Sequence, residues 1–302
     1  MNRVTDINKL DDLIEKMALV SKESPTYEKL AYCIEKNYKH IIFMTASDVA
    51  KQVNVSQGSV SRFCIALGYK GYNDFLHKLQ QFVRKEITAP QRLQYATNSN
   101  RSISNILKME RENINELETI LNQPAYQKLV DNIVNADQLI LISARMSATL
   151  LSYIYYILNK IRSNVIKITP NVPEWETLEL LDPSSVHIIT VVFPRYPNVL
   201  LNKLNELHKR HFSISAITDS ITSPVFNLAD PVMSVPITTS SIFDIYSTPI
   251  LFFNLLLRDV AGKTDGLDKR MSELEQLEKD NHIYYEINHH HSSGRYSESE
   301  LE

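Results

Sequence analysis

Two arginines stand beside hydroxyl-bearing residues at points where short, apolar, β-branched runs end. Arg145 lies in the segment Ser143–Ser147 after one such run, and Arg195 lies in the segment Pro194–Asn198 after another. Guanidinium groups, hydroxyls and the free N–H groups of a helix start bind phosphate and carboxylate well. A third polar loop covers Thr238–Ser241. The residues that we expect to bind an anion are Ser143, Arg145, Ser147, Arg195, Tyr196, Asn198, Ser240 and Ser241.

Two guanidinium groups in one crevice would repel each other unless an anion lay between them. This favours a small phosphate- or carboxylate-bearing metabolite as the ligand. The alternatives are that the serines only cap the helices that follow them, and that each arginine pairs with an acid of its own or of a neighbouring subunit.

A second kind of chemistry is indicated by residues 45–68, which predict two short helices joined by a tight turn. Thr45 can cap the first helix, with Asp48 closing a capping box. Ser56 can cap the second helix, and Gly68 can end it. Apolar residues recur at helical spacing on the inner side of the second helix, at Val60, Phe63, Cys64 and Leu67.

The outer side of the second helix carries hydrogen-bonding residues and one guanidinium group. Arg can bind guanine and Gln can bind adenine in the major groove, so these residue types suit DNA reading. From Lys39 to Arg92 there are eight Lys or Arg against three Asp or Glu, in a chain of net charge −3. Such a local basic surplus favours contact with phosphates. The expected DNA-binding residues are Gln57, Ser59, Ser61, Arg62, Lys51 and Lys70. An ordinary helical hairpin with a polar outer face is the alternative.

The two sets of residues require different scaffolds. The N-terminal part reads as helices, including a short one at Ile41–Met44, which predicts an all-α module. From Tyr126 onward, apolar runs alternate with amphipathic helices, which predicts an α/β domain with a five-stranded parallel sheet flanked by helices. The predicted strands are Leu139–Ser143, Asn164–Ile168, Val186–Phe193, Ser213–Thr218 and Val232–Val235. Ligands of such sheets bind beyond the carboxyl ends of the strands.

We place the domain boundaries from these changes in pattern. Residues 1–86 form the DNA-binding domain and residues 87–104, polar and aperiodic, form a linker. Residues 105–262 form the α/β domain, whose first helix runs from Ile103 to Leu121. Residues 263–302 form an acidic tail with a terminal helix at Leu267–Lys279, in which Leu274 and Leu277 pack.

Composition limits the other functions. A chain of 302 residues with 43% hydrophobic residues is long enough for two domains with their own cores. The chain has two cysteines, too few for a cysteine zinc site. Three of its six glycines lie in residues 58–71, so the second half has no glycine-rich nucleotide loop. We therefore expect no metal and no cofactor. With no apolar leader and no bilayer-length apolar run, we expect a cytoplasmic protein.

The sequence VSQGSVSRFCIALGYKGYNDF resembles the helix-turn-helix of RpiR-type bacterial transcriptional regulators. That family carries V-S-x-[AP]-[ST]-[VI]-x-R-F through the recognition helix and L-G-[FY]-K-G-[FY] after it. One departure is Gly58, where the family has Ala or Pro, which should loosen the first turn of this helix by up to about 1 kcal/mol relative to Ala.

The second half resembles a SIS (sugar isomerase) domain, a phosphosugar-binding module, over roughly Tyr126–Ala261. The segment AITDSITSPVFNLADPVMSVP is similar to a conserved stretch of that family. The glycines of the family's ligand loops are missing, because this chain has Ser143-Ala-Arg-Met-Ser147 and a Pro-Arg-Tyr loop in their places. The resemblance implies either an anion site of altered shape or a domain that no longer binds sugar phosphate.

These observations together predict a non-enzymatic transcriptional regulator that binds a double-stranded operator as a homo-oligomer, dimer or tetramer, and senses a phosphosugar or similar anion. One alternative is a sugar-phosphate isomerase, with Glu174, Glu176 or Glu179 as the base. Another is a regulator whose SIS-like domain only dimerises.

Overall fold

The computed structural model describes residues 10–83, 90, 93, 103–221, 223–239 and 243–284. Its N-terminal helices are α1 (Leu10–Val20), α2 (Pro25–Ile41), α3 (Ala46–Val53), α4 (Gln57–Ala66) and α5 (Tyr72–Val83). They share one apolar core, in which Phe63 and Phe75 are fully buried. The separate helix expected at Ile41–Met44 is wrong, because Ile41 is the last residue of α2 and a turn follows it.

The rest of the described chain builds an α/β domain, entered through α7 (Ile103–Leu121) and α8 (Pro124–Asn135). Its strands are β1 (Gln138–Ser143), β2 (Val165–Ile168), β3 (Val186–Val192), β4 (Ser213–Thr218) and β5 (Val232–Ser234). They form one parallel sheet in the order β2-β1-β3-β4-β5. The prediction of a five-stranded parallel sheet flanked by helices is confirmed.

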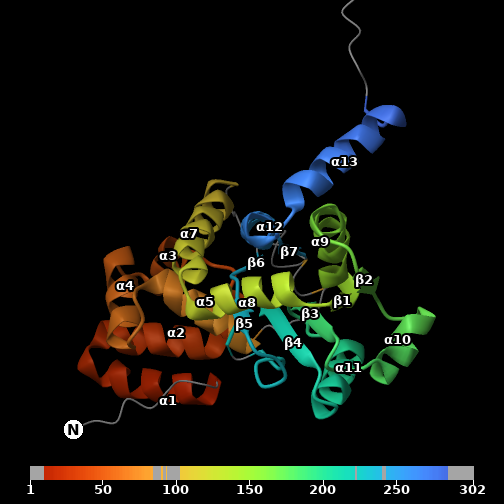
Figure 1. Ribbon diagram of the computed structural model, residues 1–302. Helices are drawn as coiled ribbons and strands as arrows, with labels where there is room; N and C mark the ends of the chain where they lie inside the picture. The colour runs from red at the N-terminus through yellow and green to blue at the C-terminus, as the bar shows by residue number, and fades with distance from the viewer. Residues whose placement is uncertain are drawn as a thin grey trace, which may run out of the picture.

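Helices cover both faces of this sheet (Figure 1). One face packs against α8, α9 (Ala148–Ile161) and α12 (Ser247–Lys263), and the other packs against α10 (Pro173–Thr177) and α11 (Asn198–Lys209). Neighbouring residues of one strand serve opposite faces, because side chains alternate along a strand. Leu139 and Leu141 point to the first face, and Ile140 and Ile142 point to the second.

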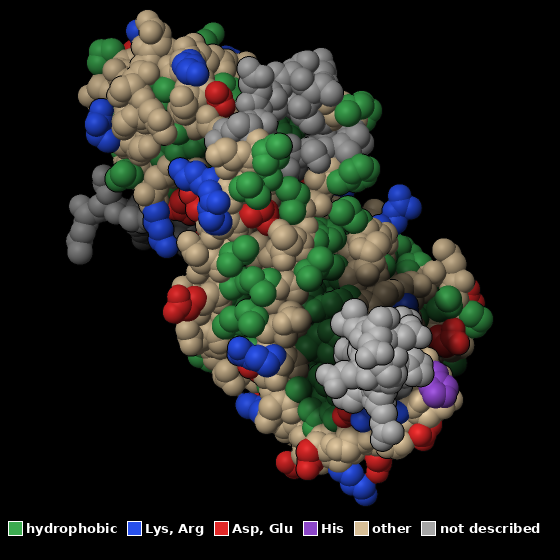
Figure 2. Space-filling view, turned by 90° about the horizontal axis from the view of Figure 1, so that it is seen from above, with side chains coloured by type: hydrophobic (Ala, Val, Ile, Leu, Met, Phe, Trp, Pro, Cys, Tyr) green, Lys and Arg blue, Asp and Glu red, His purple; other side chains and the backbone are tan. Residues whose placement is uncertain are grey.

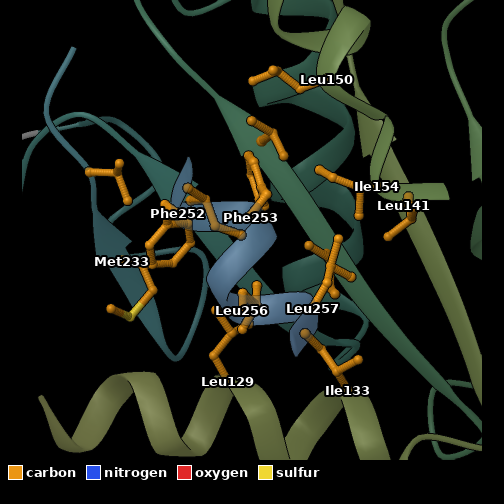
Figure 3. Packing of buried hydrophobic residues seen from close by; sticks show 14 of the residues in the cluster. Leu129, Ile133, Leu141, Leu150, Ile154, Met233, Phe252, Phe253, Leu256 and Leu257 are labelled. Carbon is orange, nitrogen blue, oxygen red and sulfur yellow. The ribbon is translucent and has the colours of Figure 1, made fainter. Parts of the chain in front are cut away.

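The first core depends on aromatic residues of α12. Phe252 and Phe253 are buried and lie between the sheet and the α8 residues Leu129 and Ile133 (Figure 3). Burying one such ring contributes about 1.5–3 kcal/mol. Tyr126 of α8 packs edge-on against Phe252, with ring centroids 6.1 Å apart.

Three further elements complete the described chain. A short antiparallel pair, β6 (Thr238–Thr239) and β7 (Asp244–Ile245), precedes α12, and the sequence did not predict it. The terminal helix α13 (Leu267–Asp280) extends away from the sheet in Figure 1. The expectation that Leu277 packs is wrong, because 57% of its surface is exposed.

Candidate effector and DNA-binding sites

The polar loops after β1 and β3 meet at one point of the sheet edge. These two strands are neighbours, but the helices that follow them cover opposite faces, α9 on one and α11 on the other. The connections therefore diverge and leave a crevice between them, which is where open α/β sheets bind their ligands.

A cavity of about 690 Å³ occupies this crevice. Arg145 and Ser147 line it from the loop after β1, and Arg195 lines it from the loop after β3. The structure thus brings together both predicted guanidinium groups and one predicted hydroxyl. The other lining residues are Ala144, Met146, Thr149, Phe193, Pro194, Pro197, Phe243 and Asp244.

Arg145 has an unusual backbone conformation. Its φ is +59°, in the left-handed region that costs a residue with a Cβ roughly 1–2 kcal/mol. Gly adopts this region without that cost. The loop therefore keeps a glycine-like backbone path while presenting a guanidinium group, and the side chains of Arg145 and Arg195 are both exposed to the cavity mouth.

Several of the predicted anion ligands are engaged inside the protein. The Ser143 hydroxyl is fully buried and donates to the carbonyl of Val191 at 2.6 Å, so it does not line the cavity. Ser147 Oγ accepts the backbone N–H of Phe193 at 3.1 Å and so ties the two loops together. The Tyr196 hydroxyl donates to Asp219 at 2.7 Å.

The remaining predicted residues of this site lie elsewhere. Asn198 begins α11 and is exposed, but it does not line the cavity. Ser240 and Ser241 lie outside the described residues. The predicted site residues did not include Phe243 and Asp244, which follow the third loop, with Asp244 at the start of β7.

The acidic residues near Trp175 are not part of this site. Glu179 Oε1 pairs with Lys203 of α11 at 2.6 Å, and neither Glu174 nor Glu176 lines the cavity. The one carboxylate that lines it among the described residues is that of Asp244, which is 8% exposed.

The helical hairpin forms as its capping residues indicate. Thr45 Oγ1 accepts a hydrogen bond from the N–H of Asp48, and Asp48 Oδ2 accepts one from the N–H of Thr45 at 2.9 Å. Ser56 Oγ accepts the N–H of Ser59 at the start of α4. Gly68, with φ +90°, follows the helix, and the predicted apolar side of α4 is buried in the core.

The outer side of α4 presents the predicted reading residues. Gln57 and Arg62 are exposed, and Ser59 and Ser61 are partly exposed. The Arg62 guanidinium lies back along the helix and donates to Ser59 Oγ at 3.2 Å. Lys51 on α3 and Lys70 after α4 are also exposed and extend this surface.

Not every basic residue between Lys39 and Arg92 is available on this surface. Lys78 is partly buried, with its Nζ 5.3 Å from the centroid of the Phe82 ring, and desolvation lowers its pKa. Arg84, Lys85 and Arg92 lie outside the described residues. Lys51, Arg62 and Lys70 are the exposed ones among the predicted DNA-binding basic residues.

The fold joins a helix-turn-helix module to an α/β domain with a cavity at the edge of its parallel sheet. Residues 13–86 match the family model of the helix-turn-helix domain, rpiR family. A search among curated protein sequences found no match.

Two solved structures share the fold. The Vibrio vulnificus NanR protein complexed with ManNAc-6P has 15% sequence identity and a TM-score of 0.51, over 89% of this chain and 99% of that chain. The sugar isomerase domain of an RpiR transcription factor from Sphaerobacter thermophilus has 23% identity and a TM-score of 0.50, over 57% of this chain and 97% of that one. Residues 13–86 thus form a helix-turn-helix domain of the rpiR family, and the chain shares the fold of these two structures.

The described residues also bear on membrane and metal binding. No helix there combines the length and apolar character that crossing a bilayer needs. The same residues contain no cluster of three or more His, Cys, Asp or Glu side chains that could hold a metal ion.

Proposed function

We propose that this regulator binds a double-stranded operator in the cytoplasm as a homo-oligomer and senses a small anionic metabolite in the crevice between β1 and β3. The observation that carries the effector assignment is the placement of Arg145 and Arg195 on one cavity. Two cations that share a cavity are stabilised by an anion that both can bind. The NanR protein of similar fold is complexed with a sugar phosphate, which supports this ligand class.

An exposed apolar surface supports the homo-oligomer. Ile103 and Leu107 of α7 and Ile250 of α12 are 76%, 51% and 43% exposed. Figure 2 shows hydrophobic side chains gathered over α7 and α12. Exposed apolar patches mark association surfaces, and a palindromic operator needs two recognition helices.

Calorimetry on the full chain tests the effector site, with ManNAc-6P and other sugar phosphates as probes. We expect Arg145→Gly/Arg195→Ala to weaken binding of any ligand of the wild type at least roughly tenfold, because charge-assisted hydrogen bonds contribute about 1.5–3 kcal/mol each. Gly at position 145 suits the left-handed backbone, so this variant should fold. Arg258→Ala removes an exposed arginine outside the cavity and is the control.

The same experiment separates the alternatives. Equal binding by the double variant and the wild type would place the site elsewhere. Binding of no anion by the wild type would favour a SIS-like domain that only dimerises. The isomerase alternative requires a base in the cavity, for which Asp244 is the described candidate. It predicts that the wild type interconverts aldose and ketose phosphates and that Asp244→Asn does not.

A further inference from the structure

The DNA-reading side of α4 shares a crevice with α7. Gln57, Ser61 and Lys70 line this crevice from the helical module, and Glu112 and Glu116 line it from α7. Its volume is about 380 Å³. In Figure 2, side chains of both charge signs lie side by side where the helical module meets the rest of the molecule.

A direct hydrogen bond holds the two parts together at this point. Asn73 Nδ2, in the first turn of α5, donates to Glu112 Oε2 at 2.8 Å. A second crevice on the same junction, of about 430 Å³, is lined by Lys51 and Gln57 on one side and by Lys108 and Glu112 on the other. Predicted DNA-binding residues thus face α7 in both crevices.

DNA and α7 compete for the same space. A recognition helix enters the major groove, which is about 12 Å wide and has a phosphate strand along each side. One of these strands would have to pass beside Gln57 and Ser61, where α7 lies. The carboxylates of Glu112 and Glu116 would also repel the phosphates.

The environment of α7 in this arrangement includes several unfavourable interactions. Partial burial, together with the neighbouring carboxylates of Asp74 and Glu112, raises the pKa of Glu116. Elsewhere on α7, Glu110 Oε1 and Asn113 Oδ1 are buried and have no hydrogen-bond partner among the described residues. Buried acceptors without partners are costly, so a shift of α7 that gave them partners would be favourable.

Glu110 and Asn113 connect α7 to elements beside the effector cavity. Asn113 Nδ2 donates to Thr238 Oγ1 at 2.8 Å, and Glu110 accepts from the Ser247 hydroxyl. Thr238 begins the β6–β7 pair, after which Phe243 and Asp244 line the cavity. One helix therefore lies across a crevice from the DNA-reading face and is also hydrogen-bonded to β6, which precedes cavity-lining residues.

We propose that α7 is an intramolecular competitor of DNA: in this arrangement, which we call covered, Glu112 and Glu116 lie across a crevice from the reading face of α4, and the module must leave α7 to bind the operator. This inference rests on the proposed function. Through Asn113 and Glu110, a ligand that moves the β6–β7 pair changes the balance between the covered and the open arrangement.

The first test uses the full chain and a fluorescein-labelled duplex that the wild type selects from a random-sequence pool. We expect Glu112→Gln/Glu116→Gln to bind this duplex at least about fivefold more tightly than the wild type, the lower end of ordinary allosteric couplings. The matched control Glu118→Gln/Glu206→Gln removes the same charge from exposed positions outside both crevices. Equal affinity of all three proteins overturns the proposal.

The second test locks the covered arrangement. In Asn73→Cys/Glu112→Cys, a short bifunctional methanethiosulfonate joins the two facing positions, while the native Cys33 and Cys64 are buried. We expect cross-linking to abolish duplex binding and a reductant to restore it. A cross-linked protein that binds like the reduced one overturns the inference and leaves the proposed function intact. If neither the reduced variant nor the wild type binds any duplex, both the inference and the proposed function are overturned.

Discussion

Lys51 and Lys70 allow the DNA-binding surface to be tested by salt dependence. Both are exposed beside the reading helix, and each can neutralise one phosphate. Each phosphate contact adds about −0.9 to the slope of log affinity against log salt on duplex DNA. In a dimer, Lys51→Ala/Lys70→Ala removes four such contacts, so the slope should become shallower by about 3.6.

This difference is large over an ordinary salt range. Between about 50 and 200 mM salt, a slope difference of 3.6 corresponds to a factor of roughly 150 in relative affinity. Fluorescence anisotropy of a labelled duplex at five or six salt concentrations measures the slope directly. The control Lys209→Ala/Lys269→Ala removes two exposed lysines from α11 and α13, and should leave the slope unchanged. Parallel lines for the test variant and the wild type would refute the assignment of this surface.

Three further predictions concern single residues. Arg62→Ala should weaken operator binding by about 1–3 kcal/mol if Arg62 contacts a base edge, and unchanged affinity of a folded variant would exclude that role. His187 is buried, with Nδ1 and Nε2 each 2.8 Å from a serine hydroxyl, and burial lowers its pKa to about 4. Protonation therefore favours the unfolded chain as pH falls below about 6.5, with a loss near pH 5 of about 2 kcal/mol. Denaturant titrations from pH 8 to 5 should show this loss in the wild type but not in His187→Gln. Gly58→Ala should raise the free energy of unfolding by up to about 1 kcal/mol, because its Cβ would lie 3.5 Å from Arg62 Nη1, an ordinary contact; a lower unfolding midpoint would contradict this.

Local signals were sufficient to predict the hairpin and the sheet. The caps at Thr45 and Ser56 depend on residues only three positions away, so the sequence contains the whole interaction. The central strands β1 and β3 are buried on both faces, so they form continuous apolar runs that are easy to recognise. Loops after β1 and β3 could be placed together because parallel strands end at one edge.

Distant contacts account for what the sequence did not predict. The hydroxyl of Ser143 could serve a ligand or the protein, and the carbonyl of Val191, 48 positions away, takes it. Leu107 and Ile114 of α7 are seven residues apart, at helical spacing, yet both are exposed. Apolar periodicity cannot tell a core from an association surface, because both favour the same residue types.

The conformation of Arg145 links the missing glycines to the proposed ligand. A glycine at this position would adopt φ +59° without steric cost, so arginine makes the loop less stable than it could be. Strained backbone at a cavity persists only where the surrounding structure enforces it, and it is commonly found at functional sites. Here Ser147, two positions later, fixes the loop by accepting the N–H of Phe193 from the neighbouring connection. The strain is therefore held by the junction of the two loops, which is also where the Arg145 guanidinium lines the cavity opposite Arg195. A preorganised anion site requires a positive charge that is held in place before the ligand binds. The Arg145 guanidinium meets this requirement, because its strained backbone is fixed by the neighbouring loop.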